Sequence, residues 1–242
     1  SIGNPSPTLF NFTPQLPHHI FNAKSMDMSA FNVSATLNVF RLIARPTLCL
    51  PHATVSTFAQ LPVPLNQAFG KYKNVDIRAV VLDKDNCFAY PHSNEVHKPY
   101  KDHFQRLKEA YPGRRLLIVS NTAGASSVDP ANNIATEVEK STGVPVLPHS
   151  TKKPGCGPEI MEYFRKYPET GVTRPEQIAV VGDRLTTDVM LANRMGSYAV
   201  WVKDGVVPLG RASIFARMEH RLAAFLQNRG YEAPEPTSPF ER

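Results

Sequence analysis

The stretch from Ile77 to Asp85 constrains the fold of this chain most strongly, because an apolar run ends there in two aspartates one residue apart. The residues up to Leu82 have the length and the Val and Ile content of a buried parallel strand. The carboxyl ends of such strands form the crevice in which open α/β sheets bind their ligands. The pattern therefore predicts a binding site that contains Asp83 and Asp85.

The Asp-x-Asp pattern allows two orientations of the second aspartate relative to the site. Alternate residues of an extended chain point the same way, so Asp83 and Asp85 face one site if the backbone stays extended, whereas Asp85 swings out if it turns. Two anionic groups this close repel each other and need a cation or a shared proton. Oxygen ligands favour a hard ion such as Mg²⁺. A capped turn in solvent, without chemistry, is the alternative that this motif alone allows.

Segments with the pattern of buried strands alternate with segments of helical periodicity along the rest of the chain. The predicted strands cover residues 116–119, 144–147, 178–181 and 198–202, and the predicted helices cover residues 100–111, 130–142, 158–167, 189–195 and 214–228. This alternation predicts an α/β fold with a Rossmann-like central parallel sheet and helices on both faces.

The last predicted helix has an apolar side and a basic side. Its apolar residues are Ile214, Phe215, Met218, Leu222, Phe225 and Leu226, and its basic side carries Arg217, His220 and Arg221. We expect the apolar side to pack on the core of the domain, as amphipathic helices usually do. A basic outer face that meets lipid phosphates is the alternative.

Composition limits the partners and the compartment. The net charge of +6 indicates an anionic partner, and the basic residues are scattered without interleaved aromatics, which argues against nucleic acid. No apolar run reaches the roughly 18 residues of a membrane span, so we expect no transmembrane segment. The three cysteines, Cys49, Cys87 and Cys156, lack metal-ligand spacing, which indicates a reducing compartment without disulfides.

The 242 residues suit one α/β domain with extensions. Residues 1–27 are rich in proline, and we interpret them as a flexible arm or an added leader, with a natural start near Met26 or Met28. Residues 28–75 are predicted to form an amphipathic helix and an irregular connector, residues 76–230 the α/β domain, and residues 231–242 a loose tail.

The amphipathic helix is predicted over residues 32–45, where large apolar side chains recur at helical spacing beside arginines. This pattern suits contact with a membrane surface and packing on the domain equally well. The residues that we expect to contact a membrane are Leu37, Phe40, Arg41, Ile43 and Arg45.

Polar side chains follow the ends of the predicted strands. Besides the two aspartates, these are Ser120 and Asn121, Lys153, and Asp183 with Asp188. The carboxyl ends of parallel strands share one edge, so these groups converge. Phosphoryl transfer through an aspartyl phosphate requires a carboxylate nucleophile, an acid–base group, a metal and a phosphate-binding cation. His92 and His97 of the intervening loop are weaker candidates for substrate contact, since loop histidines often carry no chemistry.

These motifs resemble those of the haloacid dehalogenase superfamily of phosphatases, over about residues 76–204. The resemblance implies that Asp83 is the nucleophile and Asp85 the general acid–base. It further implies that Ser120, Asn121 and Lys153 bind phosphate and that Asp83, Asp183 and the backbone carbonyl of Asp85 bind Mg²⁺. Asp188 is implied to support these ligands, with Asp183 closer to the metal. We prefer Lys153 to its neighbour Lys152 because Pro154 follows it, and we interpret Lys152 as a surface charge.

A closer resemblance links the chain to the mitochondrial phosphatidylglycerophosphate phosphatase family. It rests on residues 83–87, 120–124, 149–156 and 182–184, and on the N-terminal residues 32–50. This resemblance implies that the protein converts phosphatidylglycerophosphate to phosphatidylglycerol in cardiolipin biosynthesis. It also implies a peripheral position on an anionic membrane surface, the matrix side of the mitochondrial inner membrane.

The spacing of the motifs leaves no room for a cap domain. About 35 residues separate Asp85 from Ser120, and about 30 separate Ser120 from Lys153. Capped enzymes close over small metabolites, whereas an uncapped site can meet a head group in a bilayer. The same residues would also serve a phosphatase for a soluble phosphoester or a phosphoprotein. A non-catalytic phosphate-binding protein is disfavoured, because binding alone needs no second aspartate placed to move protons.

Overall fold

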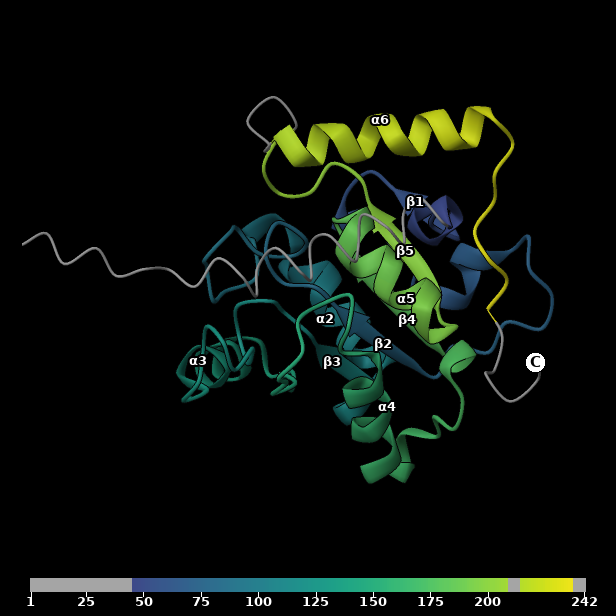
Figure 1. Ribbon diagram of the computed structural model, residues 1–242. Helices are drawn as coiled ribbons and strands as arrows, with labels where there is room; N and C mark the ends of the chain where they lie inside the picture. The colour runs from purple at the N-terminus through teal and green to yellow at the C-terminus, as the bar shows by residue number, and fades with distance from the viewer. Residues whose placement is uncertain (1–44, 209–213, 237–242) are drawn as a thin grey trace, which may run out of the picture. The chain divides into compact units, whose positions relative to one another are not determined.

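The computed structural model describes residues 45–208 and 214–236 (Figure 1). Its strands are β1 (Ala53–Val55), β2 (Ala79–Leu82), β3 (Leu116–Ile118), β4 (Ile178–Gly182) and β5 (Tyr198–Val202). They form one parallel sheet in the order β1-β5-β4-β2-β3. The helices are α2 (Lys101–Ala110), α3 (Asn133–Thr142), α4 (Gly157–Lys166), α5 (Met190–Met195) and α6 (Ile214–Asn228). The predicted α/β fold with a parallel sheet is confirmed.

Helices cover both faces of the sheet, because successive residues of each buried strand point to opposite sides. Val80 and Leu82 of β2 belong to a core that includes residues of α2 and α3. Ala79 and Val81 belong to a second core that includes residues of α4, α5 and α6. This two-sided burial explains why the strands are apolar throughout and do not alternate with polar residues.

The connector predicted before β2 consists mainly of irregular segments and short 3₁₀ turns in its described part, residues 46–75, but it contains one strand that was not predicted. Ala53–Val55 forms β1, which pairs in parallel with β5, and Phe58, Leu65 and Phe69 are buried in the core beside α2. A three-residue strand among prolines has too short a pattern to be recognised. These residues therefore belong to the α/β domain.

The strand predicted over residues 144–147 is reduced to a single bridge between Ile118 and Val146. Pro145 supplies no N–H group to a ladder, and Pro148 follows, so regular pairing cannot extend. Backbone bonds on either side of the bridge keep the segment beside β3, where the Ile118 N–H donates to the Pro145 carbonyl at 2.8 Å.

The packing predicted for α6 is wrong for most of its apolar side. Glu219, Ala223 and Leu226 are the buried residues of this helix. The large side chains of Ile214, Phe215, Met218 and Phe225 are instead 53 to 67% exposed. The reason lies in Glu219, whose carboxylate accepts hydrogen bonds from Arg184 and Thr186 and so turns the helix.

The amphipathic helix predicted over residues 32–45, with Leu37, Phe40, Arg41 and Ile43, lies outside the described residues, apart from Arg45, which is exposed. No helix in the described part of the chain combines the length and the apolarity needed to cross a bilayer. Cys49, Cys87 and Cys156 are buried free thiols.

Candidate active site

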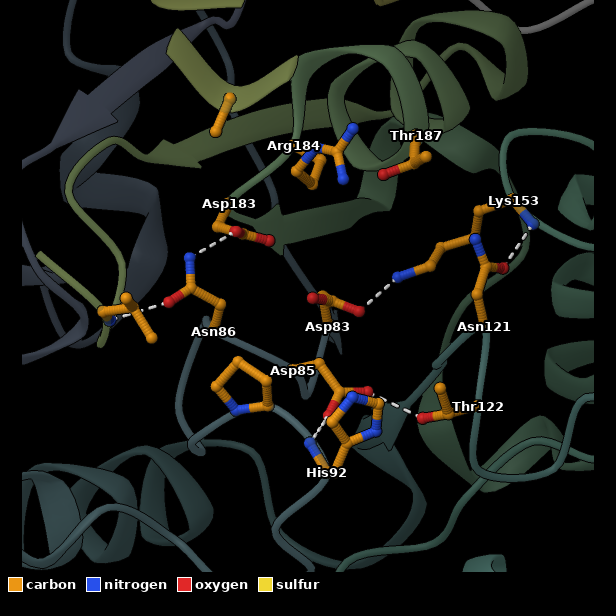
Figure 2. Close-up of a pocket in the computed structure, with 13 residues that line it drawn as sticks. Asp83, Asp85, Asn86, His92, Asn121, Thr122, Lys153, Asp183, Arg184 and Thr187 are labelled. Carbon is orange, nitrogen blue, oxygen red and sulfur yellow. Dashed lines mark hydrogen bonds and ion pairs between the residues drawn. The ribbon is translucent and has the colours of Figure 1, made fainter. Parts of the chain in front are cut away.

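The site forms where two neighbouring strands of the sheet, β2 and β4, end. Asp83 follows β2 and Asp183 follows β4, and these strands are neighbours, with Leu82 paired to Val181. The Asp83 N–H donates to the Val181 carbonyl at 2.9 Å, which holds the first aspartate in register with β4. Both aspartates line a pocket of about 370 Å³ (Figure 2). The other lining residues are Asp85, Asn86, Pro91, His92, Asn121, Thr122, Lys153, Arg184, Thr187, Val207 and Ala216.

Lys153 lines this pocket and is buried between two carboxylates. Its Nζ lies 2.5 Å from Asp83 Oδ1 and 2.6 Å from Asp188 Oδ1. Burial by itself lowers the pKa of Lys153, but the negative charges of Asp188 and Asp83 more than offset this and raise it above its usual value. The side chain is therefore held as an ammonium, and Figure 2 shows it pointing toward Asp83.

Asp188 reaches this position because Gly182 has no side chain. A Cβ atom on Gly182 would lie 2.2 Å from the carboxyl carbon of Asp188, far inside van der Waals contact. The second oxygen of Asp188 accepts from the Arg184 N–H at 3.1 Å, which fixes the carboxylate. That Asp188 supports the site stays a prediction. The contact of Asp188 with Lys153 is consistent with a supporting role.

Three carboxylates, those of Asp83, Asp183 and Asp188, gather beside the single ammonium group of Lys153. Oxygens of Asp83, Asp183 and Asp188 lie within 4.8 Å of one another. Burial, with the charge of Asp188, raises the pKa of Asp83 to about 7 although Lys153 opposes it. Burial and the charges of Asp83 and Asp188 likewise raise the pKa of Asp183 well above its usual range. An all-oxygen donor set with unbalanced negative charge fits a hard divalent cation.

Asp85 lines the same pocket but is held by different partners. The chain turns after it, with Asn86 in the left-handed region at φ +62°. The carboxylate of Asp85 accepts from Lys84 Nζ at 2.6 Å, Thr122 Oγ1 at 2.6 Å and the His92 N–H at 2.8 Å. Burial favours a raised pKa, but the hydrogen bonds from Lys84 and Thr122 outweigh it and lower the pKa of Asp85.

The remaining predicted phosphate-binding residues differ in exposure to the pocket. Asn121 lines it and accepts from the Lys153 N–H at 2.8 Å. Ser120 is fully buried, and its Oγ lies 2.9 Å from Thr122 Oγ1 and outside the lining. Thr122 lines the pocket instead, a position that sequence analysis missed although it stands two residues after Ser120 in the same polar turn.

Asn86 and Arg184 are among the other lining residues that were not predicted. Asn86 donates from Nδ2 to Asp183 Oδ2 at 2.7 Å, and its Oδ1 accepts from the Val207 N–H at 2.7 Å. Asn86 therefore joins Asp183 to the chain that leads toward α6. Arg184 lines the pocket and donates from Nε to Glu219 at 2.9 Å. Its place directly after Asp183 was the available sequence evidence.

The two loop histidines lie in different places relative to the pocket. His92 lines the pocket, whereas the ring of His97 lies 4.9 Å from the rings of Tyr90 and Tyr100 and is not among the lining residues. Lys152 is also outside the lining, next to Lys153. The geometry thus separates each ambiguous pair into one residue at the pocket and one away from it.

Comparisons with known proteins agree on one family. The profile described as "Mitochondrial PGP phosphatase" matches residues 33–207, more than half of the chain. The mitochondrial phosphatidylglycerophosphatase GEP4 of Saccharomyces cerevisiae is 47% identical over 195 residues, which cover 81% of this chain and 98% of the relative. A protein of Schizosaccharomyces pombe, named a probable mitochondrial phosphatidylglycerophosphatase, is 34% identical over 177 residues, which cover 72% and 84% of the two chains.

The similarity to a solved structure is much weaker. A crystal structure of an uncharacterized protein from Listeria monocytogenes serotype 4b aligns with a TM-score of 0.36 and 15% identity. The alignment covers 62% of this chain and 99% of that chain, and a score this low says nothing about the fold.

Proposed function

Because this chain belongs to the mitochondrial phosphatidylglycerophosphate phosphatase family, we propose that it hydrolyses the phosphomonoester of phosphatidylglycerophosphate to give phosphatidylglycerol, on the route to cardiolipin. The enzyme is a phosphatase. The observation that carries the proposed substrate is the 47% identity to a phosphatidylglycerophosphatase over 98% of that relative's length. A soluble phosphoester or a phosphoprotein is the alternative substrate, since the same residues would act on it.

In the proposed reaction the carboxylate of Asp83 attacks phosphorus, and the bond from phosphorus to the glycerol oxygen breaks. A proton from the Asp85 carboxyl group goes to that oxygen as the alcohol leaves. Asp85 then takes a proton from water, whose oxygen attacks the aspartyl phosphate and releases inorganic phosphate and the free Asp83 carboxylate. Lys153, 2.5 Å from Asp83, holds the negative oxygens of the phosphoryl group throughout.

The pKa of Asp85 bears on the first step. Asp85 must be protonated to act as an acid, yet in the structure Lys84 and Thr122 favour its charged form. A bound phosphate monoester brings negative charge beside Asp85, which raises the carboxyl pKa again. Asp85 can therefore act as an acid once bound substrate has raised its pKa. Its charged form, which the structure favours, is the form that acts as a base in the second step.

We propose that Mg²⁺ is the cofactor, held by Asp83, Asp183 and the backbone carbonyl of Asp85, with Asp188 close by. Bound there, the ion would neutralise phosphate charge and so let an anionic nucleophile approach. The cluster of Asp83, Asp183 and Asp188 supports this proposal, because its three carboxylates gather beside the ammonium of Lys153 and the pKa values of Asp83 and Asp183 are raised.

The proposed fold is that of the haloacid dehalogenase superfamily without a cap. The polar residues after β2, β3 and β4 occur in the order and spacing of that superfamily. Between β2 and β3 the chain forms α2 and short 3₁₀ turns.

Mg²⁺ should stabilise the fold more at neutral than at acidic pH. In the metal-free protein Asp83 keeps its proton up to about pH 7, whereas an unfolded aspartate loses it near its ordinary pKa of 3.8. The folded state binds more protons in this window, so the free energy of unfolding falls by a few kcal/mol, an order-of-magnitude figure, as pH rises from about 4 to 7. Above about pH 7, where Asp83 has lost its proton, bound Mg²⁺ supplies the positive charge that the proton no longer provides.

Thermal unfolding with Mg²⁺ or EDTA at pH 5 and pH 7.5 measures this effect. We expect a larger rise in melting temperature at pH 7.5, and loss of most of that rise in Asp183→Asn. EDTA should also abolish turnover, and added Mg²⁺ should restore it. Equal shifts at both pH values would contradict the proposed cluster.

Substrate choice is tested with purified protein and Mg²⁺. Phosphate release from phosphatidylglycerophosphate in mixed micelles is compared with release from glycerol 3-phosphate and a phosphotyrosine peptide. We expect kcat/KM to be roughly tenfold or more higher for the lipid, because binding of the remote diacylglycerol part stabilises the transition state. Equal or faster hydrolysis of a soluble ester would favour the alternative.

We also propose that the protein is peripheral on the matrix side of the mitochondrial inner membrane, with residues 32–45 in contact with lipid. The names of the two yeast relatives, both mitochondrial, support the organelle. Phe40→Ser with Ile43→Ser should weaken flotation with anionic liposomes, because two apolar anchors are lost. Asn38→Ser is the matched control, and unchanged flotation of the double variant would reject this helix as an anchor.

A further inference from the structure

Helix α6 presents large apolar side chains to solvent. Ile214, Phe215, Met218 and Phe225 are 63, 67, 61 and 53% exposed. In the described part of the chain, the only other large hydrophobic side chains that are exposed are Tyr90, Val128 and Tyr231, which lie apart in sequence. Apolar exposure gathered on one helix marks an interaction surface more often than scattered residues do. We call these four residues the α6 apolar face.

This orientation of α6 is fixed by polar contacts. The Glu219 carboxylate accepts from Arg184 Nε at 2.9 Å and from the Thr186 N–H at 3.1 Å. The ring of His220 contacts that of Trp201 in β5. Turning the helix to bury the apolar face would expose Glu219 and break its bonds to Arg184. These contacts therefore hold the α6 apolar face toward solvent.

The exposed surface of α6 is cationic as well as apolar. Arg217 and Arg221 line a hollow together with Ile214 and Met218. Glu219, the only acidic residue of the helix, is buried and paired with Arg184. Apolar side chains flanked by arginines, without an exposed carboxylate, are typical of helices that lie in the interface of an anionic bilayer.

The same helix borders the candidate active site. Ala216, between the exposed residues of the α6 apolar face, lines the pocket, and Arg184 joins the pocket to the buried side of α6. Figure 1 shows α6 at the outside of the described domain. Any external surface that binds α6 therefore also comes close to the pocket.

We propose that the α6 apolar face, with Arg217 and Arg221, docks on an anionic phospholipid bilayer and so places the pocket at the lipid head groups. The inference rests on the proposed function, since only a membrane-borne substrate makes this placement useful. It assigns lipid contact to a second segment of the chain, in addition to residues 32–45. A second copy of the chain is a poorer occupant, because in a two-fold interface the arginines of one helix face would meet the same cluster in the partner.

Insertion is measured directly with a fluorophore. Met218→Cys is labelled with an environment-sensitive dye, and the three native thiols do not compete because they are fully buried. With vesicles of phosphatidylglycerol and phosphatidylcholine we expect a blue shift and quenching by brominated acyl chains. Val128→Cys, exposed to 45% in the loop before α3, is the matched control and should not respond. No response at residue 218 would overturn the proposal.

The other occupants give different outcomes. A blue shift that grows with protein concentration in the absence of vesicles would indicate a second copy. A dye that is already shielded in dilute protein and does not change with vesicles would indicate that the chain covers its own α6 apolar face. Either result overturns docking on lipid.

Activity measurements separate this inference from the proposed function. Phe215→Gln with Met218→Gln should lower turnover of phosphatidylglycerophosphate in vesicles by more than about tenfold, since two apolar anchors are lost. Hydrolysis of p-nitrophenyl phosphate should stay unchanged. Arg217→Gln and Arg221→Gln should each weaken binding to anionic vesicles about fivefold at low salt. Insertion of the dye without lipid hydrolysis would reject only the substrate, and lipid hydrolysis without insertion would reject only the docking surface.

Discussion

Replacing Asp83 with asparagine is expected to lower turnover by roughly 10⁴-fold or more, because the amide cannot form the aspartyl phosphate. The fold should remain intact. The asparagine side chain has the shape of a protonated aspartate, and burial already favours that uncharged form, as the raised pKa of Asp83 shows. The melting temperature of the metal-free variant should therefore equal or exceed that of the wild type.

Asp85→Asn is the matched control for this change. With p-nitrophenyl phosphate, whose leaving group needs no proton, this variant should still form the phosphoenzyme and should then hydrolyse it slowly, because it lacks the base. Acid quenching with labelled substrate should trap phosphate on the wild type and on Asp85→Asn, but not on Asp83→Asn. Residual wild-type turnover in Asp83→Asn, or a trapped phosphoenzyme in it, would displace Asp83 as the nucleophile.

Lys153→Met should damage both stability and activity. The variant leaves the buried carboxylates of Asp83 and Asp188 without their shared ammonium, a loss that costs about 3–5 kcal/mol of unfolding free energy when a buried ion pair is broken. Turnover should fall about 10²- to 10³-fold, the usual effect of removing one group that stabilises transferred negative charge. Urea unfolding in EDTA, together with kcat at saturating Mg²⁺, measures the two effects.

Lys152→Met provides a control of the same residue type at the next position. Lys152 is only partly buried and does not line the pocket, so we expect less than about 0.5 kcal/mol of destabilisation and near-normal turnover. Added Mg²⁺ should recover part of the stability of Lys153→Met, because positive charge returns to the cluster. A larger effect at Lys152 than at Lys153 would reverse the assignment of the two lysines.

The central strands were predictable because each is a short, continuous run of buried apolar residues. Val80 and Leu82 face one core and Ala79 and Val81 the other, so no position of β2 tolerates a polar side chain. The polar residue after such a run must then lie at the edge of the sheet. Asp83, Lys153 and Asp183, which the sequence predicts to converge, do lie together in the structure, although their catalytic roles remain predictions.

Other features were hidden because they depend on partners far away in the chain. β1 exists through its pairing with β5, more than 140 positions later. Thr122 matters through a hydrogen bond to Asp85, and Asn86 through one to Asp183. None of these contacts leaves a periodic pattern in the local sequence.

By itself, the sequence determined the parallel α/β architecture and the convergence of acidic and basic groups at one edge, because burial on both faces dictates the composition of each strand. Only the tertiary structure decided which face of α6 is outward. Hydrophobic periodicity predicts burial of Phe215 and Met218, but the carboxylate of Glu219 binds Arg184 and Thr186, and a buried charge must keep its partners. Local patterns report average solvent preference, whereas such a specific contact appears only when the chain has folded.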